Sequence, residues 1–79
     1  MKHSTQASVA QAIRVQRVRA GIPSEAELAR RAGLSPSALS KRLAGDIRLD
    51  LTDIERLADA LGMDPFALLD VARVESAAA

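Results

Sequence analysis

Residues 24–45, SEAELARRAGLSPSALSKRLAG, contain two short amphipathic segments, each preceded by a serine. Ser24 is placed to cap the first segment, and Glu27 follows at the spacing of a reciprocal capping box. Ser35 is placed to cap the second segment, and Pro36 falls at the first helical position, where a missing N–H has no cost. The stretch therefore predicts one helix that begins after Ser24 and another that begins at Pro36.

The two predicted helices are separated by one tight turn at residues 32–34. Gly33 lies where the first helix must end in a left-handed conformation, which penalises any residue with a Cβ. Ala29 lies four residues earlier, where two crossing helices touch and a large side chain would force them apart. This is the layout of a helix-turn-helix over about residues 24–45, whose second helix, at about residues 36–44, can enter the major groove of DNA.

Three more helices are expected, which makes the fold class all-α with five helices. The first covers Val9 to Ala20, with Ser8 and Gln11 as its capping box. The fourth follows the cap Asp50 and has the spacing of a core-facing apolar stripe, formed by Leu51, Ile54, Leu57, Ala58 and Leu61.

The fifth helix begins at Asp64-Pro65, a cap followed by a proline at the first helical position. It is expected to direct Phe66 and Leu69 inward and to run toward Val74. The chain then divides into a flexible N-terminal tail, a DNA-binding domain and a frayed C-terminal tail, at residues 1–7, 8–74 and 75–79.

Composition argues against several classes of protein. Cysteine is absent and the one histidine lies near the start of the chain, so no metal site and no cofactor are expected. Asp53, Glu55 and Asp59 match the outer face of the fourth helix, and no Gly-rich phosphate loop is present, so an enzyme is not expected. No apolar run approaches the roughly 20 residues of a membrane span. We expect a cytoplasmic protein with no membrane segment and no small-molecule substrate.

Charge divides the chain into two parts, although the net charge is only +1. Residues 1–48 carry nine Lys and Arg against three acids, a net charge of +6, whereas residues 49–79 carry two Arg against seven acids, a net charge of −5. The basic part contains the predicted helix-turn-helix. A basic face toward phosphate and an acidic face away from it would orient the protein in the field of DNA.

A family resemblance is carried by three segments: IRVQRVRAG, ELARRAGLSPSALSKRLAG and DLTDIERLADALGMDPFALL. It lies in their order, their spacing and the residues that begin and end their helices. From Ile13 to Leu69 the chain resembles the Cro/repressor, or XRE-like, family of phage and bacterial helix-turn-helix regulators. The resemblance implies a lambda-repressor-like fold and a sequence-specific transcriptional regulator, a repressor of phage immunity or Cro type. It also implies that a homodimer binds a near-palindromic operator in double-stranded DNA.

The positions that read bases in this family fall on the second helix of the motif. They correspond here to Ser35, Pro36, Ser37 and Lys41, with Ser40 and Arg42 adjacent. Lys41 can donate to O6 and N7 of guanine. Phosphate contacts are expected from the start of the first motif helix at Ser24 and from cationic side chains, with Arg17 and Arg48 as the first candidates and Arg14 and Arg31 as further ones.

The chain departs from the family pattern at three places. The loop at residues 21–24 is one residue longer than usual. Arg42 occupies a position that is usually apolar, and Leu43 occupies one where many members carry a glutamate. We therefore expect the second motif helix to be slightly rotated, with Leu43 as its inner anchor. That glutamate is the usual partner of an arginine matched here by Arg17. We therefore expect Arg17 to stay at the surface or to pair with another acid.

A single module of this size makes few contacts with DNA, which favours a dimer bound at two half-sites. The fifth helix is the expected dimer contact because it carries surplus apolar residues: Phe66, Leu68, Val71 and Val74. An alternative keeps the fold but changes the function. It is an antitoxin-like or other protein-binding module for which DNA contact is secondary.

Overall fold

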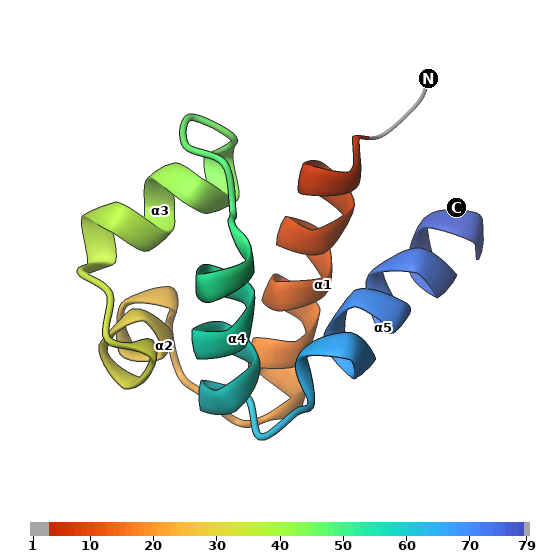
Figure 1. Ribbon diagram of the computed structural model, residues 1–79. Coiled ribbons are helices and arrows are strands. Elements are labelled where there is room, and N and C mark those ends of the chain that lie inside the picture. Colours follow the sequence, from red (N-terminus) through yellow and green to blue (C-terminus); the bar gives the residue numbers. More distant parts are fainter. Residues whose placement is uncertain (1–3, 79) are drawn as a thin grey trace.

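Five helices account for most of residues 4–78, the part of the chain that this computed structural model describes (Figure 1). They are α1 (Thr5–Arg19), α2 (Glu25–Ala32), α3 (Pro36–Ala44), α4 (Leu51–Ala60) and α5 (Pro65–Ala78). α1 packs along α5, α4 packs on both α5 and α2, and α2 packs on α3. The described residues contain no strand, so the predicted all-α class with five helices is confirmed.

The first helix begins earlier than predicted. Its N-cap is Ser4, whose side chain accepts a hydrogen bond from the N–H of Ala7 at 3.0 Å, and Ser8 lies inside the helix. The added turn contains Gln6, whose side-chain amide binds the backbone of Leu49 in both directions. Its Nε2 donates to the Leu49 carbonyl at 3.1 Å, and its Oε1 accepts from the Leu49 N–H at 2.7 Å. The start of α1 is therefore attached to the loop between α3 and α4.

The last helix also differs from its predicted bounds, because α5 continues to Ala78 instead of ending near Val74. Its start agrees with the prediction. The Asp64 carboxylate accepts from the N–H of Phe66 at 2.8 Å, and Pro65 is the first helical residue.

The two serine caps and the turn of the motif form as predicted. The hydroxyl oxygens of Ser24 and Ser35 accept from backbone N–H groups three residues later, each at 3.1 Å. Gly33 has φ +76° and ψ +24°, and the N–H of Leu34 donates to the carbonyl of Ala29 at 2.8 Å. This left-handed closure turns the chain sharply from α2 into α3.

The core is almost entirely aliphatic. Its largest fully buried side chains come from all five helices and are Ile13, Leu28, Leu39, Leu57 and Leu68. Ala29 is also fully buried, in agreement with the close approach expected beside the turn. The expected stripe on α4 is buried at Ile54, Leu57, Ala58 and Leu61 but not at its first member, since Leu51 is 75% exposed.

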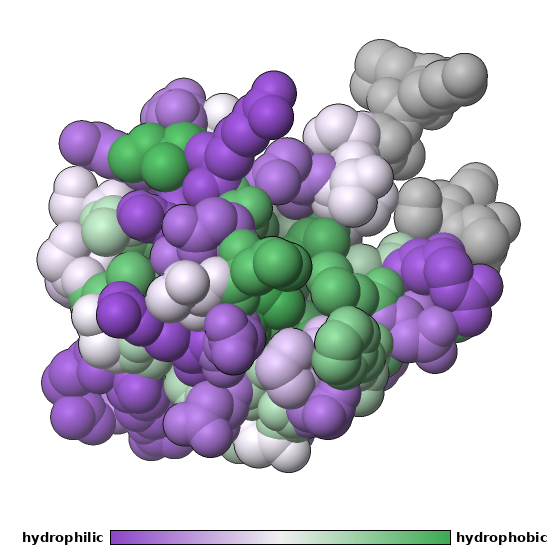
Figure 2. Space-filling view, in the orientation of Figure 1, coloured by the Kyte–Doolittle hydropathy of each residue, from purple (hydrophilic) through white to green (hydrophobic). Residues whose placement is uncertain are grey.

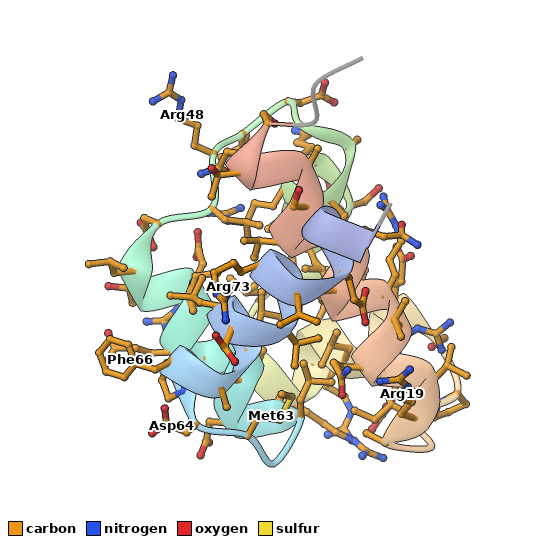
Figure 3. All side chains as sticks on the ribbon, turned by 90° about the vertical axis from the view of Figure 1, so that its right-hand side faces the viewer. Arg19, Arg48, Met63, Asp64, Phe66 and Arg73 are labelled. Carbon is orange, nitrogen blue, oxygen red and sulfur yellow. The ribbon has the colours of Figure 1, made fainter. Side chains whose placement is uncertain are left out.

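Two predictions for α5 were wrong. Phe66 was expected to point inward, yet it is 80% exposed, and Leu68 was expected at a dimer surface, yet it is fully buried. The reason is geometric, because two residues along a helix rotate the side chain by about 200°. Leu68 and Ala72, four residues apart, form the inner line of α5, so Phe66 must face the other way (Figure 3).

Asp53 is buried, although it was expected on the outer face of α4. Its Oδ2 accepts from Nε of Arg42 at 2.9 Å and from the N–H of Asp50 at 3.1 Å. The Asp50 carboxylate in turn accepts from the N–H of Asp53 at 2.7 Å, which completes a capping box. Burial acts to raise the pKa of Asp53, but the Asp50 N–H and the Arg42 guanidinium outweigh it and hold that pKa below its usual 3.8.

We predict that Gly33→Ala lowers the free energy of unfolding by about 1 kcal/mol, which corresponds to a fall in Tm of about 4–8 °C. Apart from its immediate chain neighbours, no residue lies within 4 Å of the position that a Cβ would occupy, so the loss comes from the left-handed backbone. Gly33→Asn, which tolerates this conformation better, should lose less. Urea denaturation measures both variants, and equal stability of Gly33→Ala and the wild type would contradict the assignment.

We predict that Asp53→Asn lowers the free energy of unfolding at pH 7 by about 1–3 kcal/mol. Because the pKa of Asp53 in the folded protein is depressed, the charged carboxylate stabilises the fold above 3.8 and loses this effect as the pH falls through the folded pKa. The gap between variant and wild type should therefore be constant above about pH 5 and narrow below about pH 4. Denaturation across this range measures the gap, with the exposed Asp59→Asn as control, and a gap that persists unchanged in acid would refute the prediction.

Candidate nucleic-acid interface

The outward face of α3 is polar and accessible. Leu39 and Leu43, four residues apart, bury the inner face, which confirms Leu43 as an inner anchor. The predicted reading residues on the opposite side are exposed: Ser35, Pro36, Ser37, Ser40 and Lys41. Figure 2 shows hydrophilic side chains over α2, a mixture of pale and hydrophilic ones over α3, and hydrophobic ones that gather over α4 and the start of α5.

Two exposed cations lie on α3 and in the loop that follows it. Lys41 lies on α3 itself, and Arg48 projects from the loop that follows it (Figure 3). Among the described residues, neither side chain makes an ion pair or a hydrogen bond that would have to break before it could reach DNA. The loop that carries Arg48 is held by the contact between Gln6 and the Leu49 backbone.

Arg42 does not belong to the reading face, and its predicted role is corrected. Its side chain is only 20% exposed, because it turns toward α4 and forms the ion pair with Asp53. Its Nη1 also donates to the carbonyl of Ala38, one turn earlier, at 3.0 Å. With its side chain turned toward α4 and its Nε and Nη1 engaged inside the fold, Arg42 is directed away from the face that would meet a base.

Arg17 satisfies neither expectation made for it. It is half-buried, and its Nη1 donates to the carbonyl of Ile22 at 2.7 Å. Among the described residues it pairs with no acid, and its buried Nε has no hydrogen-bond partner. Arg17 therefore closes the loop between α1 and α2 instead of projecting as a free cation toward phosphate.

The two remaining phosphate candidates are partly exposed but already engaged. Arg14 donates from Nη2 to the Leu43 carbonyl at 3.0 Å and lies 3.7 Å from the carboxylate of Glu25. Arg31 donates to Glu27 at 2.8 Å. Both can exchange these partners for phosphate only by giving up an internal contact.

The start of α2 combines the Ser24 cap with a neutralised acid. Glu27 does not complete the predicted capping box, because its carboxylate binds the side chains of Arg30 and Arg31. Hydrogen bonds from Arg30 and then Arg31 lower the pKa of Glu27 to about 2, so it stays ionised and paired. This pairing offsets a negative charge in the first turn of α2, whose N–H groups are the expected anchor for a phosphate.

Two residues that support this interface escaped the sequence prediction. Asp53 follows Asp50 at capping-box spacing, a signal that could have placed it inward. Gln6 gives no local signal, because its partner lies 43 residues away. Among the described residues, no group of acids, histidines or cysteines is arranged to hold a metal ion. In the same part of the chain, no helix is both long and apolar enough to cross a membrane.

Comparisons with known proteins agree with this geometry. The family model described as a helix-turn-helix domain matches residues 8–72. Among solved structures, the chain is similar to the crystal structure of a hypothetical transcription factor, NHTF, from Neisseria, with 35% sequence identity and a TM-score of 0.76. That similarity covers 84% of this chain and 75% of the other. No curated protein matches the chain.

The family match begins in α1 and ends in α5, so it includes the motif and the three helices packed around it. The chain therefore belongs to the helix-turn-helix domain family, in agreement with the XRE-like resemblance of its sequence.

Proposed function

We propose that this protein is a sequence-specific transcriptional regulator that binds double-stranded DNA, a repressor of phage immunity or Cro type, with α3 in the major groove. One observation carries the proposal: α3 buries Leu39 and Leu43 and presents an exposed polar face with Lys41 on it. The similarity to a hypothetical transcription factor from Neisseria supports the same class of function.

Reading and positioning fall to different residues in this proposal. Lys41 donates to guanine, while Ser37 and Ser40 donate or accept at neighbouring base edges. Ser35 and Pro36 lie at the start of α3, where the proline ring can contact a thymine methyl. Phosphate is bound by Arg48 and by the N-terminus of α2 at Ser24. Arg14 and Arg31 are further candidates, which would first have to give up an internal contact.

The distribution of charge supports this orientation. Residues 1–48, which include α2 and α3, have a net charge of +6, and residues 49–79, which include α4 and α5, have a net charge of −5. In Figure 1, α5 lies on the side of α1 and α4 opposite to α3. The acidic residues of α5 are therefore kept off the face that α3 would present to the DNA.

A homodimer on a near-palindromic operator completes the proposal. Two exposed apolar side chains remain on α5, Phe66 at 80% and Val74 at 51%, and Val71 is half-buried beside the core. Two modules joined through this helix could place their α3 helices one turn of DNA apart and read two half-sites.

A protein-binding, antitoxin-like role is the second candidate, and one observation favours it. An open hollow of about 410 Å³ lies between the starts of α1 and α4 and the side of α5. Most of its lining residues are apolar: Val9, Leu49, Leu51, Ile54 and Leu69. An apolar hollow of this kind can accept a side chain of another protein. Co-purification with a small toxin would favour this candidate over the regulator.

We predict that Lys41→Ala relaxes base preference at one position of the operator, at about 1–3 kcal/mol of lost discrimination. Arg48→Ala should weaken all sequences alike and reduce the slope of log affinity against log salt by about 1. Selection from random duplexes, followed by sequencing and by binding titrations at several salt concentrations, measures both effects. An equal loss of selectivity in the two variants would contradict the assigned roles, and no selective retention by the wild type would overturn the proposal.

We predict that Phe66→Glu raises the dissociation constant of the dimer by about tenfold or more, because it places a charge in the apolar contact. Val18→Glu is the matched control, since Val18 is also exposed, at 65%, but is the neighbour of Arg19, which Figure 3 shows on the other side of α5 from Phe66. Sedimentation at micromolar concentration, with and without the operator, measures the assembly. A wild-type protein that is monomeric in both conditions would rule out the dimer.

A further inference from the structure

We propose that Arg42 is a positioning residue for base selection: by binding Asp53 of α4, its guanidinium fixes the rotation of α3 about its own axis. This inference rests on the proposed function, in which α3 reads DNA. It assigns to Arg42 and Asp53 an effect on sequence preference, although neither side chain lies on the reading face.

The guanidinium of Arg42 is held in one orientation by two acceptors on different elements. Nε lies 2.9 Å from Oδ2 of Asp53, and Nη1 lies 3.0 Å from the carbonyl of Ala38 on α3 itself. A planar group with fixed donor directions cannot rotate without losing one of these bonds. The two side chains are 20% and 6% exposed, so salt screens this pair less than it screens an ion pair in open solvent.

The carboxylate on the other side is equally constrained. The same Oδ2 of Asp53 accepts from the N–H of Asp50, and Asp50 caps α4 through the N–H of Asp53. Arg42 is therefore attached to the rigid first turn of α4, and not to a freely rotating side chain. The pair transmits the position of α4 to α3.

α3 needs such an attachment because its apolar contact is narrow. The helix has nine residues, and its two fully inward side chains, Leu39 and Leu43, lie on a single line along it. A short helix that rests on one line can roll about it. Arg42 is one residue from that line, about 100° around the helix, where its contact opposes a roll.

A small roll would matter for reading. At the outer radius of a helix, about 5–6 Å, a roll of about 20° moves an atom by about 2 Å. That displacement is enough to break hydrogen bonds from Ser37, Ser40 or Lys41 to base edges. Arg14 holds the Leu43 carbonyl from the side of α1, so the contact with α4 is needed to complete the support.

The test uses Arg42→Met and Asp53→Asn in the full chain. Arg42→Lys is a milder variant that keeps the charge but lacks the fixed donor directions of the guanidinium. Base preference is measured by selection from random duplexes, salt slope by titration, and folding by circular dichroism and urea denaturation. Binding is measured below the unfolding transition of each variant. If Arg42→Met does not fold, Arg42→Lys and Asp53→Asn carry the test.

We expect Asp53→Asn and the Arg42 variants to alter base preference in the same way, at more than one position, with an unchanged salt slope. The ratio of operator to non-specific affinity should fall roughly tenfold. Asp53→Asn is the sharpest variant, because removal of a negative charge by itself would strengthen binding to every sequence. A purely electrostatic effect would thus leave the ratio of operator to non-specific affinity unchanged, whereas the inference predicts that this ratio falls.

Two results would overturn the inference. A wild-type base preference in both Asp53→Asn and Arg42→Lys would show that the pair only stabilises the fold. A salt slope reduced by about 1 in Arg42→Met, with Asp53→Asn unchanged in preference, would show that Arg42 contacts phosphate. Neither result touches the proposed function, which fails only if the wild type itself retains no sequence selectively.

Discussion

Burial of Leu39 and Leu43 is the interaction on which the candidate interface depends. These two side chains decide which side of α3 faces the core, and the serines and Lys41 are outward because the leucines are inward. The left-handed turn at Gly33 brings α3 against α2 at the angle that this packing requires. An exposed polar face on a short helix is therefore a consequence of how its apolar residues are spaced.

Local signals in the sequence predicted most of the helix starts and the turn correctly. A capping serine and a glycine act on backbone groups within a few residues, so Ser24, Ser35 and Gly33 could be placed without knowledge of the rest of the fold. The predicted start of α1 was wrong, because Ser4 and Ser8 are both of a residue type that can cap a helix. The start at Ser4 brings Gln6 into the helix, where its side chain binds the backbone of Leu49, 43 residues away.

Residues whose position depends on tertiary packing were predicted less well. Arg42 was assigned to the reading face because it is adjacent to the family's base-reading positions, but it pairs with a buried acid on α4. Phe66 was assigned to the core because it is large and apolar, but the line from Leu68 to Ala72 determines the orientation of α5. Both errors have the same origin: each residue was placed by its type, without knowledge of the tertiary contacts that determine its direction.

The attachment of Gln6 to the Leu49 backbone differs in kind from the ion pair that steadies α3. An amide has no charge to titrate, so this attachment is insensitive to acid and only weakly sensitive to dissolved ions. The pair of Arg42 and Asp53 lacks this protection. Acid strong enough to protonate Asp53, whose pKa lies below its usual 3.8, should therefore loosen the recognition helix while the loop after it remains attached, so that discrimination between sequences is lost before non-specific binding to DNA.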